Sequence, residues 1–376
     1  MNVSLRSSLR SLFRFVFPFV FGIALAAALV ACTPDASTDD PGMRSAAVDD
    51  AVRAHMNEYT VPGLSLAVVQ DGQVVKRDAY GLADRAASRS ATNQTIYQLA
   101  SVTKTTAGVG VMRLVERGVL ALDDSIHTHL SDLPDPWRGV TLRHVLSHTS
   151  GLPSMLDPDT GDLLDGSTTA EAFAAAAKRP LQFDPGARWA YTQINYYVAQ
   201  RIVEQTTGQP WEAYAHEHIF APAGMSNTFF LGETAPDSGR VATAYRVPDR
   251  APEPFDFDAA YEYYVPAAAG LFSTTGDLVH LVRALRTGAL LSPDPKRQMW
   301  TAVDTDYADA PIAGYGIGWT VDTYEGHRRV WHSGGGKATV MHYPDDALSV
   351  IVLTNRAGHD VNALASAVTD IFLPED

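Results

Sequence analysis

The chain has 376 residues, of which 46% are hydrophobic and 19% are charged, a composition typical of a globular protein. Its formal net charge of −14 excludes nucleic-acid binding through a strongly basic surface, because such binding needs clustered Lys and Arg. The single cysteine, Cys32, excludes an internal disulfide and a zinc site made of cysteines. This length suits one large domain or two small ones.

The first 31 residues have the pattern of an export signal. Arg6, Arg10 and Arg14 precede an uncharged apolar run over residues 15–31. As a helix this run is slightly short for a hydrocarbon core of roughly 30 Å, so removal is favoured over a retained membrane anchor.

Cys32 follows two apolar residues and an alanine, which resembles the signal of bacterial lipoproteins. The resemblance implies lipidation of Cys32 and anchoring in the cell envelope, facing the periplasm. Thr33, rather than Asp, follows the cysteine and favours the outer membrane. The alternative is an ordinary signal with a cysteine there by chance. Residues 32–44 are polar and rich in Pro, Asp, Ser and Thr, which predicts a flexible tether.

Residues 45–376 are predicted to form the folded domain, with strands near both ends and helices between them. The predicted strands are 63–70, 73–80, 316–322, 328–331, 338–343 and 348–354. The predicted helices are 46–59, 105–117, 143–147, 169–178, 195–206, 275–285 and 361–372. Asp71-Gly72 between the first two strands is a strong hairpin signal.

The order of these elements predicts an α/β (α+β) fold. Hairpin connections favour antiparallel pairing, so we expect one antiparallel sheet built from both chain ends and flanked by helices. The sheet lobe would comprise about 45–98 and 286–376. The mostly helical lobe would comprise about 99–285, inserted between them, with a cleft where the lobes meet.

Ser101 and Lys104 lie three residues apart at the start of a predicted helix. That spacing places both side chains on one face, so the amine reaches the hydroxyl. The helix N-terminus would stabilise an oxyanion, and a buried Lys loses its proton readily and acts as a base. Lys104 is the only one of the five lysines with Ser three residues before it. The alternative is a serine N-cap with an exposed lysine.

Tyr191-Thr192-Gln193 lies on a loop that leads into a helix. A tyrosine near an ammonium group would serve as a proton relay, because the positive charge favours the phenolate. A core aromatic residue is the alternative.

His332-Ser333-Gly334-Gly335 lies between two predicted strands. Small residues there let the backbone approach a ligand closely, and a glycine N–H would serve as an oxyanion donor. A glycine-rich hairpin without function is the alternative.

Together the three motifs resemble, in type, order and spacing, those of the serine β-lactamase and penicillin-binding superfamily. The resemblance is strongest to the branch of class C β-lactamases, D-stereospecific peptidases and β-lactamase-fold carboxylesterases. Further similar stretches lie at 142–152, 208–210, 220–225, 270–278 and 315–319. The resemblance covers about residues 48–372 and implies a β-lactamase/transpeptidase-like fold.

The resemblance also implies roles for individual residues. Ser101 would be the nucleophile, and Lys104 would share its deprotonation with Tyr191, which later protonates the leaving group. The N–H groups of Ser101 and Gly335 would form the oxyanion hole. His332 would face a substrate carboxylate or the Tyr191 phenol.

Gln193, Ser333 and Gly334 would line the substrate. The chain departs from the family pattern at Gln193, where Asn is usual, and at His332, where Lys is usual. A register that uses Asn195 instead would place Tyr191 at the wrong spacing. His332 has an ordinary pKa of about 6.5, so we expect Michaelis constants for anionic substrates to change as it titrates.

Both departures favour an esterase or D-peptidase over an efficient β-lactamase. A β-lactamase or a D-Ala carboxypeptidase is the alternative. The expected substrate is a small or peptide-like ester or amide, and we expect no cofactor because the chain supplies every reacting group.

Three other interpretations stay open. His144 and His148 lie four residues apart, the spacing of two metal ligands on one helix, although no Glu lies between them. A lipoprotein that binds penicillins or muropeptides without hydrolysing them would use the same residues. A scaffold of the cell envelope would not need Ser101. The sequence does not specify an oligomeric state.

Overall fold

The computed structural model describes residues 40–157, 163–164, 168–255 and 265–373. The predicted export signal, Cys32 and most of the predicted tether lie outside these residues. None of the helices in the described part of the chain has the length and hydropathy of a membrane-spanning segment.

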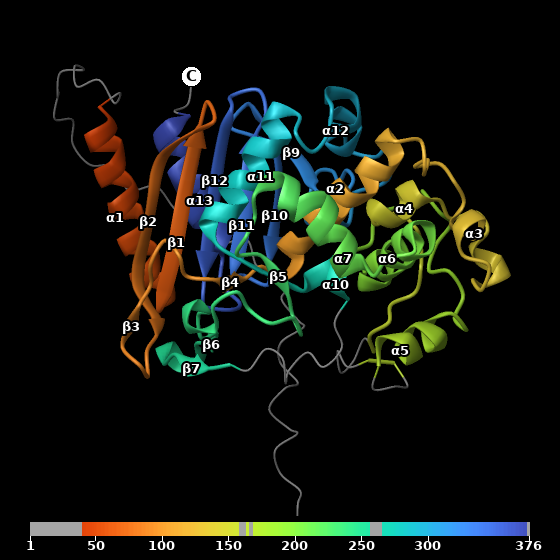
Figure 1. Cartoon of the computed structure of the whole chain (residues 1–376), viewed down its shortest axis with the longest axis horizontal. Coiled ribbons are helices and arrows are strands. Elements are labelled where there is room, and N and C mark those ends of the chain that lie inside the picture. The colour runs from red at the N-terminus through yellow and green to blue at the C-terminus, as the bar shows by residue number, and fades with distance from the viewer. Residues whose placement is uncertain (1–39, 158–162, 165–167, 256–264, 374–376) are drawn as a thin grey trace, which may run out of the picture.

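Both ends of the chain build one seven-stranded antiparallel sheet, which confirms the predicted architecture (Figure 1). Its order is β3-β2-β1-β12-β11-β10-β9, so the first strand pairs directly with the last. The strands are β1 (Gly63–Gln70), β2 (Gln73–Asp84), β3 (Arg89–Ser90), β9 (Thr320–Tyr324), β10 (His327–Gly334), β11 (Ala338–Tyr343) and β12 (Leu348–Thr354).

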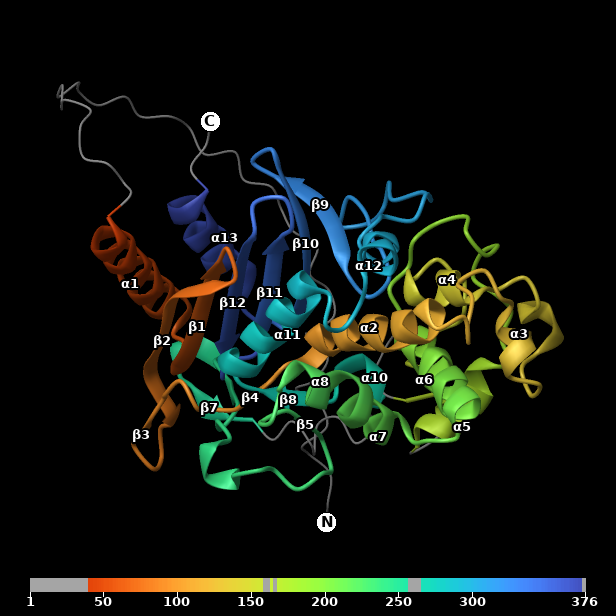
Figure 2. The same ribbon diagram turned by 45° about the horizontal axis from the view of Figure 1, so that its top comes forward.

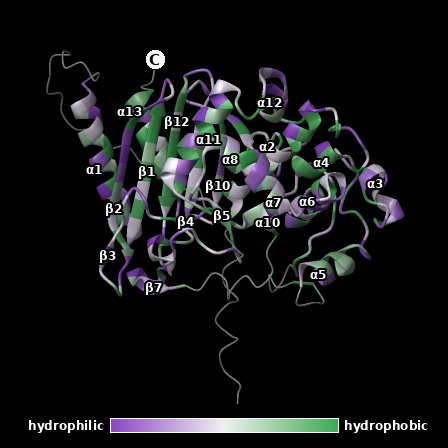
Figure 3. Cartoon of the chain, viewed as in Figure 1, coloured by the Kyte–Doolittle hydropathy of each residue, from purple (hydrophilic) through white to green (hydrophobic). Residues whose placement is uncertain are grey.

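Helices cover both faces of this sheet, and side chains alternate between the two faces along each strand. Leu64 and Leu66 of β1 pack with the terminal helices α1 (Pro41–Tyr59) and α13 (Val361–Phe372) in one hydrophobic cluster. Ala67 of β1 and its neighbours on the opposite face pack with the helical lobe in the second cluster. Figure 3 shows the central strand β12 as largely hydrophobic, which fits a strand buried on both faces.

Helix α1 begins at Pro41, five residues earlier than predicted. The Asp40 side chain accepts the Gly42 N–H at 2.8 Å, and Pro41 occupies the first turn, where its missing N–H costs nothing. Residues 41–44 are therefore helical and do not belong to the predicted tether. A segment that is too polar to be buried in a core still begins a helix when a side chain caps the N-terminus of that helix.

The helical lobe is built around α2 (Thr103–Glu116), which is buried over most of its length and runs from the sheet into the lobe (Figure 2). It packs against α6 (Gln193–Thr207), α10 (Pro266–Ala269) and α12 (Pro293–Met299). A Cβ at Gly108 would collide with the Ile317 carbonyl, so glycine lets the 315–319 segment lie directly on α2. The other α-helices among the described residues are α3 (Ile126–His129), α4 (Leu142–Leu146), α5 (Thr169–Ala176), α7 (Trp211–Ala215), α8 (Ala221–Ala223) and α11 (Thr275–Thr287).

The structure also contains short strands, one just before the inserted lobe and the others within it, that the sequence did not predict. A three-stranded sheet has the order β4-β8-β5, and β6 pairs with β7. These strands are β4 (Tyr97–Gln98), β5 (Phe229–Phe230), β6 (Tyr245–Arg246), β7 (Glu253–Pro254) and β8 (Leu271–Ser273). Strand β4 lies directly before Ser101, so this small sheet holds the segment that carries the predicted nucleophile.

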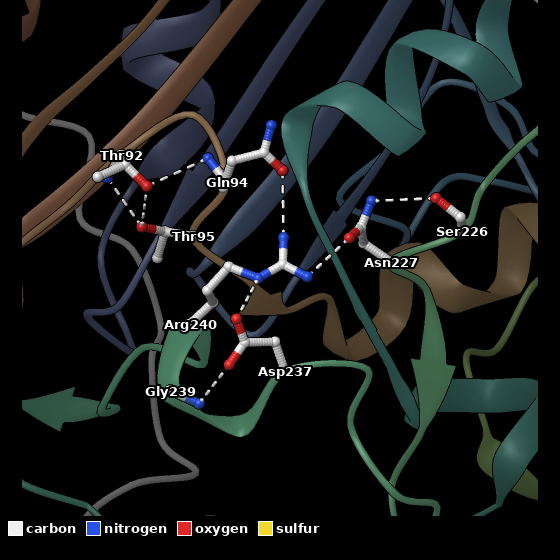
Figure 4. A network of polar contacts seen from close by, with 8 residues as sticks. All are labelled: Thr92, Gln94, Thr95, Ser226, Asn227, Asp237, Gly239 and Arg240. Carbon is white, nitrogen blue, oxygen red and sulfur yellow. Dashed lines mark hydrogen bonds and ion pairs between the residues drawn. The ribbon is translucent and has the colours of Figure 1, made fainter.

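A network of polar side-chain contacts connects the segment just before β4 to the helical lobe (Figure 4). The Arg240 guanidinium donates to the Gln94 side chain at 3.1 Å, to Asn227 at 2.9 Å and to Asp237 at 3.1 Å. The Asn227 backbone N–H in turn donates to Asp277 of α11 at 2.7 Å. The segment just before β4, which leads to Ser101, is thus connected to α11, a long helix that lies on the sheet.

Candidate active site

Ser101 lies in a single 3₁₀ turn, Ala100–Val102, directly before α2. Ala100 has a φ of +46°, a left-handed conformation that non-glycine residues rarely adopt. The turn is held by a hydrogen bond from the Leu99 N–H to the Leu271 carbonyl at 2.8 Å and from the Thr103 hydroxyl to the Ala100 carbonyl at 2.6 Å. The sharp turn and these bonds fix the position of the Ser101 side chain.

Lys104 is fully buried beneath Ser101. Its Nζ lies 2.9 Å from Gln193 Oε1, 2.9 Å from the Ala268 carbonyl oxygen and 3.4 Å from Ser101 Oγ. Burial holds the pKa of Lys104 well below its usual value of 10.5. The amine is therefore predisposed to be neutral, as the sequence analysis predicted for a buried Lys.

The contacts of Lys104 decide what a neutral amine does there. A neutral amine has two hydrogens and one lone pair. The two shorter contacts, to Gln193 and Ala268, are made to oxygens that only accept, so they take both hydrogens. In a neutral amine that donates both hydrogens to these oxygens, the lone pair is left for Ser101 Oγ at 3.4 Å, as a general base requires.

Tyr191 lies on the other side of Ser101, with 39% of its surface exposed. The Lys104 Nζ lies 4.8 Å from the centre of the Tyr191 ring. Desolvation raises the pKa of Tyr191 above its usual value, and the neighbouring Ser101 hydroxyl offsets only part of this rise. The expectation that an ammonium would favour the phenolate is wrong, because the lysine loses its own charge. A protonated Tyr191 suits the role of acid towards a leaving group.

Gln193, the first residue of α6, takes the position of the amide in the second motif. Its Oε1 orients the Lys104 amine, as described above. Asn195 points elsewhere: its Oδ1 accepts the Ser150 hydroxyl at 2.6 Å and its Nδ2 donates to His148 at 3.0 Å. The register that uses Gln193 is therefore the one that reaches the lysine.

Gly334, the last residue of β10, lies against the backbone that carries Ser101. A Cβ on Gly334 would collide with the Leu99 carbonyl and come within 2.9 Å of the Ser101 nitrogen. Gly335 follows with a left-handed φ of +55°, and its carbonyl accepts the Gly358 N–H at 3.0 Å. The structure thus brings the third motif beside the Ser101 backbone. An oxyanion hole made by the N–H groups of Ser101 and Gly335 fits this arrangement and stays a prediction.

His332 is buried and does not hydrogen-bond the Tyr191 phenol. Its Nδ1–H donates to the Ser333 carbonyl at 2.7 Å, and its Nε2 accepts the Tyr315 hydroxyl at 2.9 Å. Burial and the neighbouring Lys104 lower the pKa of His332 to about 3. The expected titration near neutral pH is therefore wrong, and His332 offers a substrate no permanent positive charge.

Tyr315 was missed as a residue of the site, although the stretch that contains it was recognised as similar to the family. Its hydroxyl holds His332 in place, and its ring packs 5.1 Å from His148. A tyrosine in a loop carries no local signal for such a role.

His144 and His148 serve separate partners. His144 Nδ1 accepts the Thr141 N–H at 3.2 Å and completes the cap of α4. His148 lies beyond the end of that helix, and its Nδ1 accepts the Thr192 N–H at 3.4 Å. The two residues therefore do not share a helix face, which removes the geometric basis for a joint metal site.

A cavity of about 720 Å³ opens beside Tyr191 and Gln193. Its wall is mostly apolar, and it also contains one cationic residue, Arg179, and one anionic residue, Asp157. The apolar wall is contributed mainly by Pro153, Leu156, Pro180 and Leu181. A cavity of this size and character accommodates the organic group of a small substrate.

The chain belongs to the Beta-lactamase family, whose sequence model matches residues 48–371. Esterase EstB of Burkholderia gladioli is 28% identical over 377 residues, which cover 86% of this chain and 93% of that protein. A putative D-alanyl-D-alanine carboxypeptidase of Escherichia coli O157:H7 is 26% identical and covers 78% of each chain.

Among solved structures, the octameric penicillin-binding protein homologue from Pyrococcus abyssi superposes with a TM-score of 0.76 at 27% identity. The superposition covers 88% of this chain and 77% of that one. The family and the arrangement of Ser101, Lys104 and Tyr191 define a serine hydrolase.

Proposed function

We propose that the chain hydrolyses small carboxylic esters through an acyl-enzyme on Ser101. The observation that carries this proposal is the buried Lys104 amine, whose Nζ lies 2.9 Å from two oxygens that only accept and 3.4 Å from Ser101 Oγ. This arrangement suits a lysine that accepts the proton of the Ser101 hydroxyl when the serine attacks a substrate.

In the acylation step, Ser101 Oγ attacks the ester carbonyl carbon and its proton passes to Lys104. The N–H groups of Ser101 and Gly335 stabilise the oxyanion of the tetrahedral intermediate. When the intermediate collapses, Tyr191 gives its proton to the departing alcohol and regains one from Lys104. Water then attacks the acyl-enzyme and passes its proton to Lys104, which returns the proton to Ser101 Oγ as the carboxylic acid departs.

Two features favour an ester over a β-lactam. A β-lactam carries a carboxylate, and the neutral His332 on β10 provides no charge to anchor it. The cavity beside Tyr191 is mostly apolar, which suits an uncharged acyl or alcohol group. Similarity to an esterase over 93% of that protein's length supports the same choice.

A peptide ending in a D-amino acid is the second candidate. Arg179 lies in the wall of the cavity that adjoins Tyr191, where it would pair with a terminal carboxylate. Similarity to the putative carboxypeptidase supports this candidate.

The test is to incubate the purified full chain with p-nitrophenyl butyrate, a D-alanyl-D-alanine peptide and a chromogenic cephalosporin in parallel. Turnover and the mass of the intact protein are followed together, with Ser101→Ala as control. We expect ester turnover with a transient adduct on Ser101. A stable cephalosporin adduct without turnover of any compound would instead identify a penicillin-binding protein that does not hydrolyse. Ester turnover that persists in Ser101→Ala would refute the proposal.

We also propose that Cys32 carries a lipid and holds the enzyme in the cell envelope, facing the periplasm. The export signal, the position of the cysteine and the polar residues that follow it support this proposal. The test is metabolic labelling with a fatty acid followed by membrane fractionation. Cys32→Ala is expected to remove the label and release the protein from membranes, and an unlabelled wild-type chain would contradict the proposal.

A further inference from the structure

His148 accepts hydrogen bonds from Ala190 and Thr192, the residues on either side of Tyr191. Its carbonyl accepts the Ala190 N–H at 2.8 Å, and its ring Nδ1 accepts the Thr192 N–H at 3.4 Å. His148 is fully buried and adopts a left-handed φ of +61°, which turns the chain towards the Tyr191 loop. The position of this loop therefore depends on a histidine that lies more than forty residues earlier in the chain.

The imidazole ring of His148 also supports the Tyr191 ring directly. The two ring centroids are 4.3 Å apart, with a tilt of 39°. Tyr196 at 5.3 Å and Tyr315 at 5.1 Å surround the same imidazole. The ring thus lies between the tyrosine of the second motif and the tyrosine that holds the histidine of the third motif.

The hydrogen bonds of His148 define its tautomer. Nδ1 accepts from the Thr192 N–H and from Asn195 Nδ2, so it carries no proton. In the neutral ring the proton lies on Nε2, which is buried without a hydrogen-bond partner among the described residues. Burial, with Lys104 and His332 nearby, holds the pKa of His148 well below its usual range. Leaving a buried N–H unpaired costs stability that an apolar ring would not lose.

We propose that His148 is a positioning residue that aims the Tyr191 hydroxyl at Ser101 and the leaving group. Its Nδ1 fixes the peptide that follows Tyr191, and its ring face fixes the plane of the phenol. The inference rests on the proposed function, in which Tyr191 protonates the departing alcohol.

Two variants separate the two contacts. His148→Asn keeps a hydrogen-bond acceptor, the amide oxygen, where imidazole Nδ1 lies. Asparagine also tolerates the left-handed backbone conformation, but the substitution removes the ring. His148→Phe keeps an aromatic ring but removes the acceptor. His144→Asn is the matched control, because His144 lies on the same segment and its Nδ1 accepts only the Thr141 N–H of the α4 cap.

The experiment compares ethyl butyrate, whose leaving group needs a proton, with p-nitrophenyl butyrate, whose leaving group does not. We expect both His148 variants to lower kcat for the ethyl ester by about 10- to 100-fold, with KM within about twofold. The loss with the p-nitrophenyl ester should be below about threefold, and Tyr191→Phe should show the same selectivity. The His144 control should change neither rate.

Tyr191→Phe is also combined with each His148 variant. If His148 acts through Tyr191, the His148 substitutions change the ethyl ester rate little once the hydroxyl is gone. Equal losses with both esters, or equal losses with and without the Tyr191 hydroxyl, would show a purely structural role and overturn the inference. A wild-type chain that cleaves neither ester would instead overturn the proposed function and, with it, the inference.

Thermal unfolding of each variant is measured beside the kinetics. A variant that unfolds below the assay temperature is set aside, and the other variant decides the outcome, because each removes a different contact.

Discussion

Lys76 and Lys104, two of the buried lysines, lie in different regions of the molecule, and their surroundings are opposite. Lys76 on β2 is 8% exposed, and its Nζ lies 2.7 Å from Asp49 and 2.8 Å from Asp78. Lys104 on α2 is 0% exposed, and its hydrogen-bond partners among the described residues are all neutral.

The partners decide what each lysine does. Desolvation lowers the pKa of Lys76, but hydrogen bonds and attraction to Asp49 and Asp78 outweigh it and raise the pKa above the usual value. At Lys104 desolvation acts without opposition and lowers the pKa. Burial without a neighbouring carboxylate thus favours a neutral lysine that acts as a base. Burial beside carboxylates favours a charged lysine with a structural role.

The largest expected effect comes from Lys104→Met, which keeps the length of the side chain and removes the amine. Hydrolysis of p-nitrophenyl butyrate should fall by about 10³-fold or more, because no base remains to accept the Ser101 proton. The free energy of unfolding by urea should stay equal or rise, since a costly buried polar group is gone. Turnover within tenfold of wild type would show that Lys104 is not the base.

Acid should destabilise the protein through buried histidines that, like Lys104, are held neutral. Burial lowers the pKa of His332 to about 3 and that of His342 to about 4, whereas both are about 6.5 in the unfolded chain. As pH falls from about 6.5 towards 4, the unfolded state binds protons that the folded state does not. Each histidine should therefore remove about 1.4 kcal/mol of stability per pH unit.

Urea unfolding at a series of pH values between 7.5 and about 4.5 measures this slope. His342→Gln, which does not titrate, should reduce the slope by the share of one histidine. A stability that does not change across this range would show that these histidines are protonated in the fold.

Lys76→Met should give the reverse of the Lys104 result. It leaves Asp49 and Asp78 without their cation, and because both carboxylates are partly exposed we expect a loss of about 1–2 kcal/mol. Ester turnover should be unchanged, and Lys178→Met, at an exposed position, should change neither property. A loss of turnover in folded Lys76→Met would contradict the separation of the two roles.

The smallest effect is expected from Arg240→Ala, which removes the polar network before β4. The ion pair with Asp237 is largely solvated, so the loss of unfolding free energy should be about 0.5–1 kcal/mol. A small decrease in ester turnover should accompany it if the network helps to hold the Ser101 segment. Urea unfolding measures the first effect and ester turnover the second. A loss of several kcal/mol of unfolding free energy would show that the network stabilises the fold as buried polar groups do, and not as a solvated surface ion pair.

The fold was predictable where apolar runs end at strong turn residues. Strands β1, β11 and β12 and helix α13 have the predicted boundaries, because Gly, Asp and Pro or a capping residue delimit each of them. Strands β4, β5 and β8 were missed, because two or three residues show no periodicity. Their pairing is decided by the surrounding lobe.

The site was predictable where its chemistry is local in sequence. Ser101 and Lys104 are three residues apart, and Gln193 follows two residues after Tyr191, so the motifs themselves expose them. The bond between Tyr315 and His332 spans 17 residues and depends on the packing of a loop. The pH at which His332 titrates was wrong for a similar reason, because its pKa depends on burial that no local pattern reveals.

The direct pairing of β1 with β12 has a consequence for the order of folding. The Gly63 N–H donates to the Asn355 side chain across 292 residues, and the two strands are neighbours at the centre of the sheet. Closing so long a loop slows the formation of this pair. Until the last strand is synthesised, the β1–β2 hairpin has an unpaired, apolar edge, which is an aggregation hazard. The chain therefore completes its central sheet only near the end of its synthesis, and truncation before β12 leaves β1 and β11 without the strand that lies between them.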